Sequence, residues 1–372
     1  MRLGINGWRL THHRTGVGRV IRNLVRAWDT RASARYSQLT VYTPRPLDAD
    51  DEAALSATVQ RRVLVPDARM LVWENTVLGP RTDDRVLFCP SYSAPLVTRA
   101  RTVVATHDMI FWVKPELFPP HSRAFYRSLY RWSAERAVFV VTPVEAVRAQ
   151  VIECWGIDPD RVRVTHHAPA SHFAVVDDQP ALAAVRRRVL GADVPFFLFV
   201  GKTTGRRSLP RVLEGFAQVV HGTTLPHRLV FVGHGTDSAD LQAAVARLGL
   251  SERVVMAGFL EDATVNLLYN AAAALVTGAV YETNSLPVME AQAAGLPVIC
   301  YRNAGMLEIT GGSAVFLDDL DPKGVCDAMV AIATDAALCR QLRDGGLASA
   351  SRFSWARCAR ETMAVLDEAA SA

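Results

Sequence analysis

Short apolar runs alternate with amphipathic segments along the whole chain. In the first half, helical patterns such as VGRVIRNLVRAW separate the apolar runs RLGIN, LTVYT, RVLFCP, TVVATHD and AVFVVTP. Runs that are apolar at nearly every position are typical of strands buried on both faces, as in a parallel sheet covered by helices. The pattern therefore predicts an α/β domain with a parallel sheet.

The second half repeats this alternation. Its expected strands are FFLFVG, HRLVFVG, RVVMAG, AALVTG and PVICY, and its expected helices are LPRVLEGFAQVV, SADLQAAVARLG, ATVNLLYNAA and PVMEAQAAG. Between the halves, FAVVDDQPALAAVRRRVLGADVP mixes Asp and Pro with one helical piece, so we place the domain boundary near residues 174–194. A chain of 372 residues is long enough for two doubly wound domains.

Composition narrows the class of protein. Half of the residues are hydrophobic and 21% are charged, as in a soluble globular protein. The N-terminus lacks the apolar core of a signal peptide, and no stretch approaches the roughly 20 apolar residues of a spanning helix, so we expect a cytoplasmic protein. The cysteines follow neither a CxxC nor a zinc-ligand spacing and are expected to be small core residues. They are Cys89, Cys154, Cys300, Cys326, Cys339 and Cys358.

Charge is distributed unevenly. Residues 1–176 carry a net charge of +8 (24 Arg and Lys against 16 Asp and Glu), and residues 177–372 one of −4 (17 against 21). A basic first half suits an anionic partner or a membrane surface, or is simply a well-solvated face. No nucleic-acid partner is expected.

One segment of the basic half, HSRAFYRSLYRWSAERA, has Arg123, Arg127 and Arg131 recurring every four residues beside aromatic side chains. On a helix this spacing makes a basic stripe flanked by aromatics. Two readings stay open: peripheral contact with the inner face of an anionic membrane, or solvated arginines over aromatics that face the core.

The segment YETNSLPVMEAQAAGLPVIC carries the main candidate chemistry. A buried strand leads into a loop with Glu282, and Glu290 lies about one turn into the following helix. Ligands of open α/β sheets bind at the carboxyl ends of strands, so both carboxylates can approach one ligand near the helix N-terminus. Free N–H groups there suit a phosphate, and carboxylates accept hydrogen bonds from sugar hydroxyls. The alternative is a capped helix with two surface glutamates.

This segment resembles the donor site of the retaining nucleotide-sugar glycosyltransferases of family 4, and the resemblance continues in order over nearly the whole chain. The matching residues of the segment are Glu282, Glu290, Ala291, Gly295, Pro297 and Val298. The resemblance implies the GT-B fold, two facing Rossmann-like domains. Residues 1–175 would form the acceptor domain and residues 195–353 the donor domain, with a closing helix at 354–372 that crosses back to the first domain.

The resemblance also implies a site for the donor diphosphate. Lys202 and Arg207, which follow the run FFLFVG, would bind the diphosphate and offset the charge that builds on it. Gly16 and Gly18, in a glycine turn that opens a helix, would face the same group across the cleft. A simple tight turn is the alternative for these two glycines.

The remaining roles concern the sugar, the nucleoside and the acceptor. By resemblance, His107 hydrogen-bonds a hydroxyl beside the reacting carbon, and Asp108 orients the acceptor. Glu282 would hold sugar hydroxyls or stabilise positive charge at the reacting carbon, while Glu290 would bind the ribose. Further donor contacts are implied for Gly233, Phe259, Leu260, Asn284, Ser285 and Leu286. No role is expected for His166, His167 and His172, which look like loop residues.

The implied reaction transfers a hexose from a GDP- or UDP-sugar to a hydroxyl of a glycan, a lipid-linked intermediate or a small natural product, with retention. No metal or other cofactor is expected, because cationic side chains are placed to do a metal's work. The family's small-aromatic-small run is replaced here by Thr283, Asn284 and Ser285, which leaves the donor sugar open. An inactive GT-B partner protein and a UDP-sugar 2-epimerase are the alternative functions.

Overall fold

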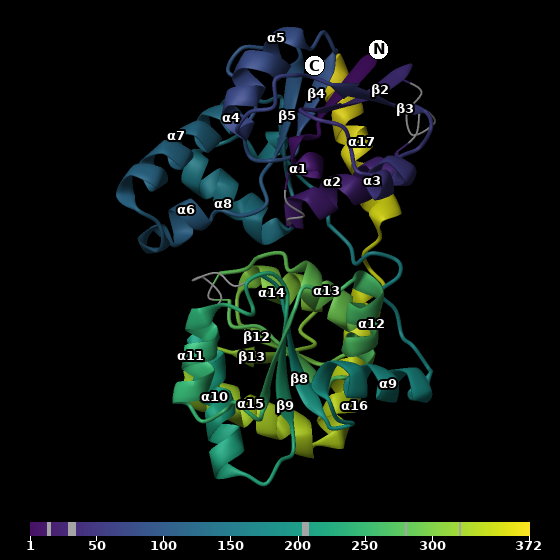
Figure 1. Ribbon diagram of the computed structural model, residues 1–372. Coiled ribbons are helices and arrows are strands. Elements are labelled where there is room, and N and C mark those ends of the chain that lie inside the picture. Colours follow the sequence, from purple (N-terminus) through teal and green to yellow (C-terminus); the bar gives the residue numbers. More distant parts are fainter. Residues whose placement is uncertain (13–15, 29–34, 203–207, 280, 320) are drawn as a thin grey trace. The chain divides into compact units, whose positions relative to one another are not determined.

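The computed structural model describes residues 1–12, 16–28, 35–202, 208–279, 281–319 and 321–372 (Figure 1). The chain forms two compact units. Unit 1 consists of Met1–Ala168 and Phe353–Ala372, and unit 2 consists of Pro169–Arg352. The division between Ala168 and Pro169 precedes the expected boundary region. Backbone amides of Ala174 and Val176 donate to side-chain oxygens of Asn266 and Asn270, 3.2 and 2.8 Å away, and so tie the connecting segment to unit 2.

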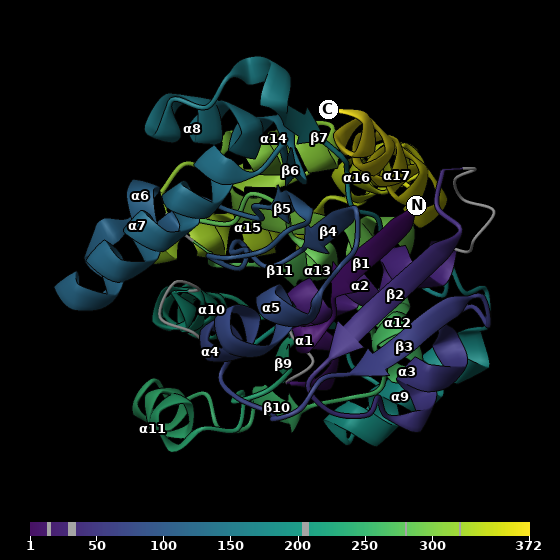
Figure 2. The same ribbon diagram turned by 90° about the horizontal axis from the view of Figure 1, so that it is seen from above.

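Unit 1 contains a seven-stranded parallel sheet with the strand order β3-β2-β1-β4-β5-β6-β7. Figure 2 shows β3, β2, β1, β4 and β5 following one another across the sheet. Central strands are fully buried because helices cover both faces, as the apolar runs predicted. The strands are β1 (Arg2–Asn6), β2 (Gln38–Thr43), β3 (Val59–Val63), β4 (Val86–Cys89), β5 (Arg101–Ala105), β6 (Phe139–Thr142) and β7 (Val162–Val164).

The helices of unit 1 include the last helix of the chain. They are α1 (Trp8–Thr11), α2 (Gly16–Ala27), α3 (Ala49–Ala54), α4 (Met70–Trp73), the π-helical η1 (Glu74–Leu78), α5 (Gly79–Arg81), α6 (Ile110–Val113), the 3₁₀ turn η2 (Pro115–Leu117), α7 (Pro120–Arg136), α8 (Glu145–Trp155), the 3₁₀ turn η3 (Pro159–Arg161) and α17 (Trp355–Ser371).

The helix α17 packs beside α2 and against the sheet of unit 1 (Figure 1). Two buried hydrogen bonds fix it: the Trp28 indole donates to the Ala359 carbonyl at 2.8 Å, and the Tyr36 hydroxyl donates to the Leu366 carbonyl at 2.6 Å. The expected return of the C-terminal helix to the first domain is confirmed.

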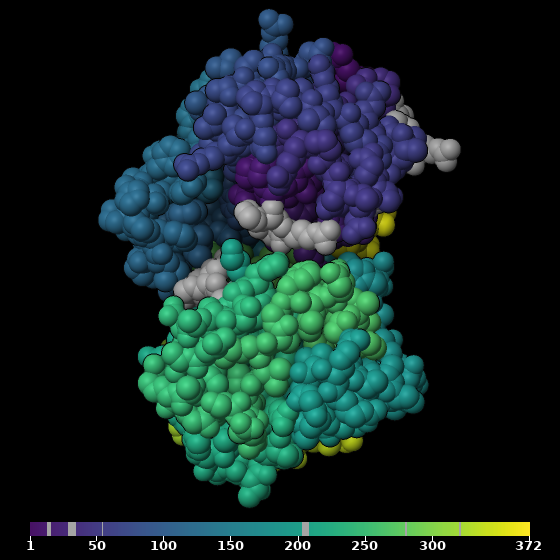
Figure 3. Space-filling model, in the orientation of Figure 1, coloured from purple at the N-terminus to yellow at the C-terminus, as the bar shows by residue number. Residues whose placement is uncertain are grey.

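Unit 2 contains a six-stranded parallel sheet with the order β10-β9-β8-β11-β12-β13. Its core is built on Phe197, Phe199, Phe216 and Phe231, all 0% exposed. The strands are β8 (Phe196–Val200), β9 (Arg228–Val232), β10 (Val254–Gly258), β11 (Ala274–Val276), β12 (Val298–Tyr301) and β13 (Val315–Leu317). The helices are α9 (Gln179–Leu190), α10 (Leu209–Gly222), α11 (Ala239–Arg247), α12 (Asp262–Ala271), α13 (Leu286–Ala293), α14 (Ala304–Thr310), α15 (Pro322–Thr334) and α16 (Ala336–Ala350). Side chains fill the spaces between these ribbons within each unit (Figure 3).

Candidate functional site

The strand order of each sheet reverses at one place. In unit 1 the chain builds outward from β1 in one direction and from β4 in the other, and in unit 2 it does so from β8 and β11. Open parallel sheets bind ligands beyond the carboxyl ends of the strands at such a reversal. The loops after β1, β4, β8 and β11 are therefore the places to look for chemistry.

Beyond β8 and β9, the carboxyl edge of unit 2 is made of closely packed backbone. Gly201 follows β8 and donates its N–H to the Val232 carbonyl at 2.9 Å, and Gly233 follows β9 and donates to the Gly258 carbonyl at 2.7 Å. Gly233 has φ of +132°, and a Cβ there would lie 2.4 Å from the Gly201 carbonyl oxygen. Only glycine fits this position, because the Gly201 backbone leaves no space for a Cβ. The contact of Gly233 with a donor stays a prediction.

We call the backbone around Gly201 and Gly233 the glycine edge. A lysine and a pair of stacked aromatic rings follow these glycines in the sequence. Lys202 directly follows Gly201 and is exposed. The rings of His234 and Phe259 stack at a centroid distance of 4.9 Å with an interplanar angle of 13°, and Phe259 is 48% exposed. Leu260 is partly buried beside it. An ammonium group and an exposed ring stack suit a phosphate and a planar base, respectively.

The loop between β11 and α13 is fixed by the neighbouring helix α14. Asn303 caps α14 by accepting the Met306 N–H at 2.9 Å and donates its side-chain amide to the Glu282 carbonyl at 3.1 Å. Gly305 lies against the Thr283 backbone, and a Cβ at Gly305 would come within 2.2 Å of the Thr283 carbonyl oxygen. The Glu282 backbone is thus held in place while its side chain stays partly exposed.

Glu290 lies inside α13 and is only 1% exposed. Its Oε2 accepts the Tyr269 hydroxyl at 3.2 Å. The interpretation of both glutamates as surface residues is wrong for Glu290. A ribose hydroxyl would have to share or replace the Tyr269 bond. Ser285 is the N-cap residue of α13 and Leu286 its first residue, and both are buried, whereas Asn284 is partly exposed.

In unit 1, His107 follows β5 and is fixed by a backbone carbonyl. Its Nε2 lies 2.7 Å from the Pro90 oxygen. Burial lowers the pKa of His107 below its usual value, so the ring is neutral at neutral pH. The Pro90 carbonyl can only accept, which assigns the proton to Nε2 and leaves Nδ1 as an acceptor. A sugar hydroxyl can donate to that nitrogen.

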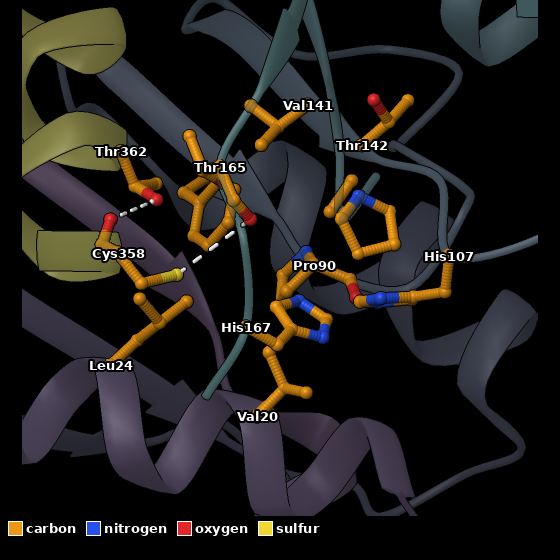
Figure 4. A pocket seen from close by; sticks show the side chains of 13 residues that line it. Val20, Leu24, Pro90, His107, Val141, Thr142, Thr165, His167, Cys358 and Thr362 are labelled. Atoms are coloured by element: carbon orange, nitrogen blue, oxygen red, sulfur yellow. Dashed lines mark hydrogen bonds between the residues drawn. The ribbon is translucent and has the colours of Figure 1, made fainter. Parts of the chain in front are cut away.

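His167 lies behind His107. Figure 4 shows both rings at one cavity together with Pro90 and Val20 of α2. The cavity measures about 10 Å³, about the space of one water molecule. The two imidazole centroids are 5.5 Å apart, and His167 also stacks with Trp355 at 5.6 Å. Burial, followed by the nearby His107, lowers the pKa of His167 well below its usual value. His167 is a loop residue as expected, but it supports the His107 ring.

Asp108 organises the loop around His107. Its Oδ1 accepts the Ile110 N–H at 3.2 Å at the start of α6, and its Oδ2 accepts the Tyr92 hydroxyl at 3.1 Å. Tyr92 has the unusual φ of +67°, and its ring stacks on Tyr130 at 5.0 Å. This conformation costs a non-glycine residue about 1–3 kcal/mol, so the contacts with Asp108 and Tyr130 must hold Tyr92 in it.

Glu74, which no sequence pattern singled out, is buried at the β1/β4 reversal. It is 0% exposed. The Asn6 side-chain amide donates to its Oε1 and the Ser93 hydroxyl donates to its Oε2, both at 2.7 Å. Burial raises the pKa of Glu74 to about 8, so its carboxyl group is neutral at neutral pH. A glutamate in the middle of the apolar run MLVWENTVLG was the only signal in the sequence.

Comparison with known proteins places part of unit 2 in a known family. Residues 185–345 match the family model described as glycosyl transferases group 1. Residues 185–345 are a group 1 glycosyl transferase domain.

Two relatives of the group 1 domain extend the match toward the N-terminus to different degrees. The O-antigen chain mannosyltransferase B of Escherichia coli is 23% identical over 318 residues, which cover 85% of this chain and 83% of that protein. A D-inositol 3-phosphate glycosyltransferase of Acidothermus cellulolyticus is 29% identical over 226 residues, which cover 58% of this chain and 50% of that protein.

Solved structures extend the likeness to the whole chain. The structure of Anabaena HepE in complex with UDP and glucose has a TM-score of 0.76 at 15% identity, and the match covers 99% of each chain. With two Rossmann-like units and a returning helix, the chain has the GT-B fold.

Three of the predicted diphosphate contacts are Arg207, Gly16 and Gly18. Arg207 lies outside the described residues. Gly16 and Gly18 open a helix as predicted, but they lie in the first turn of α2 rather than in a turn directly after β1, from which α1 separates them. Gly18 is buried, and a Cβ at Gly16 would meet no described atom within 4 Å. Their role toward the diphosphate stays a prediction.

The basic stripe of Arg123, Arg127 and Arg131 forms part of the helix α7, as predicted. Arg131 pairs with Glu135, and Arg127 lies 5.4 Å from the centre of the Trp112 ring. Tyr130 is buried, whereas Phe125 is 55% exposed. No helix in the described part of the chain is long and apolar enough to cross a membrane. Part of the stripe's charge is thus balanced within unit 1.

Proposed function

We propose that this group 1 glycosyltransferase moves a hexose from a nucleotide diphosphate sugar to an acceptor hydroxyl with retention at the reacting carbon. The observation that carries this proposal is the edge of unit 2 between β8 and α13. At this edge the strand order of the sheet reverses between β8 and β11. The loops there carry Gly233, which has no space for a Cβ, and the ammonium group of Lys202. The carboxylates of Glu282 and Glu290 follow β11.

Each part of that edge fits one part of such a donor. The glycine edge admits a phosphate close to the backbone, and Lys202 offsets its charge. The Glu290 carboxylate suits ribose hydroxyls, and the His234–Phe259 stack suits the base. Glu282, whose backbone is held by Asn303, would hold hydroxyls of the transferred sugar.

Retention follows in this proposal from attack on the donor face that the leaving group occupies. The acceptor oxygen forms a bond to the reacting carbon as the bond from that carbon to the diphosphate oxygen breaks. The proton of the acceptor hydroxyl passes to the leaving phosphate. Lys202 stabilises the negative charge on that phosphate. His107, with Nδ1 as an acceptor, positions a hydroxyl.

A thermal-shift panel of UDP, GDP, dTDP and ADP tests the donor side. A nucleotide present at 100 times its Kd adds about 2.7 kcal/mol to the free energy of unfolding. One nucleotide should raise the melting temperature at micromolar to millimolar concentration, and the matching nucleotide sugars can then be assayed for turnover. If no nucleotide binds, the proposal fails.

Turnover assays with the matching nucleotide sugars separate the alternative functions. Turnover of the donor without an acceptor would point to a 2-epimerase, and binding without turnover on any acceptor would point to an inactive partner protein. UDP is bound by HepE and mannose is in the name of the Escherichia coli relative, so UDP- and GDP-sugars are the first donors to try.

Contact with an anionic membrane through α7 stays a prediction for the acceptor side. The exposed Phe125 beside Arg123 favours it. Sedimentation with vesicles that contain anionic lipid, at low and high salt, tests it.

A further inference from the structure

A second group of polar side chains surrounds the β1/β4 reversal of unit 1, and one of them has no place in the proposed reaction. Arg9 lies in α1, which begins two residues after β1 ends. Its guanidinium is close enough to Glu74, His107 and Tyr130 to act electrostatically on all three. Arg9 therefore faces the carboxyl edge of the sheet, where His107 and Asp108 also lie.

Arg9 is held in position through its neighbour. The carbon of its guanidinium lies 5.4 Å from the centre of the Trp8 ring. The Trp8 indole donates to the Ala68 carbonyl at 3.0 Å and stacks on His12 at 3.9 Å with an interplanar angle of 4°. Trp8 is thus clamped on two sides, and the guanidinium rests against a fixed ring rather than moving freely in solvent.

The guanidinium has donors left over. The Nε of Arg9 is shielded from solvent and has no acceptor among the described residues. Buried N–H groups without an acceptor are rare in folded proteins and commonly mark a site where another molecule supplies the acceptor. The planar fork of guanidinium N–H groups matches the two oxygens of a carboxylate or phosphate.

The neighbouring carboxyl groups of Glu74 and Asp108 form no ion pair with Arg9 in the described part of the chain. Glu74 accepts hydrogen bonds from Asn6 and Ser93, and its burial keeps it neutral at neutral pH because its pKa is raised to about 8. Asp108 accepts from Tyr92 and from the Ile110 amide.

We propose that Arg9 binds an oxyanion, a phosphate or carboxylate, that the acceptor substrate carries near its reacting hydroxyl. This inference rests on the proposed transfer reaction and names the class of acceptor, an anionic sugar or polyol rather than a neutral glycan end. The donor is the second possible source of a phosphate. Unit 2 has its own cation and glycine edge for the donor diphosphate, so Arg9 is left for the acceptor.

The test uses the full chain saturated with the nucleoside diphosphate that the panel identifies, so that the donor site is occupied. Inorganic phosphate and the pair inositol 3-phosphate and inositol are then titrated by calorimetry. We expect inositol 3-phosphate to bind at least about tenfold more tightly than inositol, and Arg9→Gln to remove that difference. Arg9→Lys should retain part of it, because a lysine keeps the charge but not the fork.

Arg99→Gln is the matched control. Arg99 is an exposed residue just before β5, at the opposite edge of the same sheet, and the substitution removes the same charge from unit 1. It should leave all three titrations unchanged. Thermal melting of each variant checks that the Arg9 substitutions fold.

Each outcome is decisive. Phosphate binding that depends on Arg9 in the nucleotide-saturated protein supports the proposal. Arg9→Gln that weakens nucleotide binding tenfold or more, or phosphate binding that nucleotide abolishes, assigns Arg9 to the donor and overturns it. Binding of nucleotide with no Arg9-dependent binding of phosphate or inositol 3-phosphate overturns this inference alone, whereas absence of nucleotide binding overturns the proposed function.

Discussion

The two units share one architecture but expose different atoms at their carboxyl edges. Both have a parallel sheet whose strand order reverses in the middle. In unit 2 the strands β8, β9 and β10 meet a glycine backbone at Gly201, Gly233 and Gly258. In unit 1 the corresponding edge consists of packed side chains, including Glu74 and His107.

The two edges therefore offer different chemical properties to a ligand. The glycine edge of unit 2 allows close approach to the backbone, while the N–H groups of Gly201 and Gly233 donate to the Val232 and Gly258 carbonyls. A side-chain edge offers groups whose protonation depends on burial, since burial raises the pKa of Glu74 and lowers that of His107. We therefore expect substitutions in unit 1 to alter chemistry and protonation, and substitutions in unit 2 to alter nucleotide binding and backbone stability.

The sequence offers a way to follow one unit at a time. All tryptophans lie in unit 1, so tryptophan fluorescence reports the unfolding of unit 1 while far-UV circular dichroism reports both units. They are Trp8, Trp28, Trp73, Trp112, Trp132, Trp155 and Trp355.

The largest effect is expected for His107→Ala. Removal of the imidazole that positions a hydroxyl should lower the rate of transfer by about 10²-fold or more, while the Kd of the nucleotide stays within about twofold because the predicted nucleotide contacts belong to unit 2. Steady-state kinetics and calorimetry measure the two quantities. His121→Ala, at an exposed histidine of α7, should change neither. A loss of nucleotide affinity in the His107 variant would contradict the division of roles.

Gly233→Ala should destabilise unit 2 by about 3 kcal/mol, because φ of +132° is strained for alanine and the new Cβ would meet the Gly201 carbonyl. Circular dichroism should show an earlier transition, and the tryptophan transition should be unchanged. The control is Gly222→Ala at the end of α10, where a Cβ meets nothing within 4 Å. Its stability should stay the same or rise by up to about 1 kcal/mol. Equal destabilisation by both variants would argue against a steric limit at Gly233.

Glu74→Gln tests the protonation of the unit 1 edge. The pKa of Glu74 is about 8 in the folded protein against 4.5 as its ordinary value. The folded state therefore holds a proton that the unfolded state releases, and this stability is lost as pH rises from about 4.5 to 8. The Glu74→Gln variant cannot release a proton at this position, so its free energy of unfolding does not decrease for this reason over that pH range.

Urea unfolding followed by tryptophan fluorescence measures the effect at pH 5.5 and 7.5. The free energy of unfolding of the variant relative to wild type should increase by about 2 kcal/mol between the two pH values. The buried histidines titrate in both proteins and cancel in this difference. A pH-independent difference would mean that Glu74 is ionised in the folded state.

Lys202→Ala should weaken nucleotide diphosphate binding by about tenfold, or about 1.4 kcal/mol, because an ammonium group no longer offsets the phosphate charge. Lys323→Ala in α15, which removes a lysine paired with Asp327, should leave the Kd unchanged. An unchanged Kd in the Lys202 variant would remove that residue from the donor site.

The smallest effect is expected from chelation. If cationic side chains rather than a metal offset the diphosphate charge, transfer activity should stay within about twofold after EDTA treatment. Loss of activity that Mg²⁺ restores would show that the unit 2 edge is incomplete without a metal ion.

Local patterns in the sequence determined most of the architecture. Buried strands such as FFLFV and RLVFV are apolar at nearly every position, and this pattern alone indicates a parallel sheet covered on both faces. The missed strands have no such pattern. In β3, VQRRV lies at a sheet edge and is mostly exposed, whereas β7 and β13 have only three residues each. The motif around Glu282 and Glu290 pointed to the group 1 domain that residues 185–345 match.

Tertiary structure alone decided the state of the side chains. Asn6 and Glu74 are 68 positions apart in the sequence but share a hydrogen bond in the fold. Arg9 and His107 are nearly 100 positions apart. Burial, tautomer and protonation arise when such distant residues meet, because desolvation depends on the surrounding atoms and not on the local pattern. For the same reason Glu290, predicted from a helix position, proved to be buried against Tyr269, and His167, an ordinary loop residue in the sequence, came to support the His107 ring.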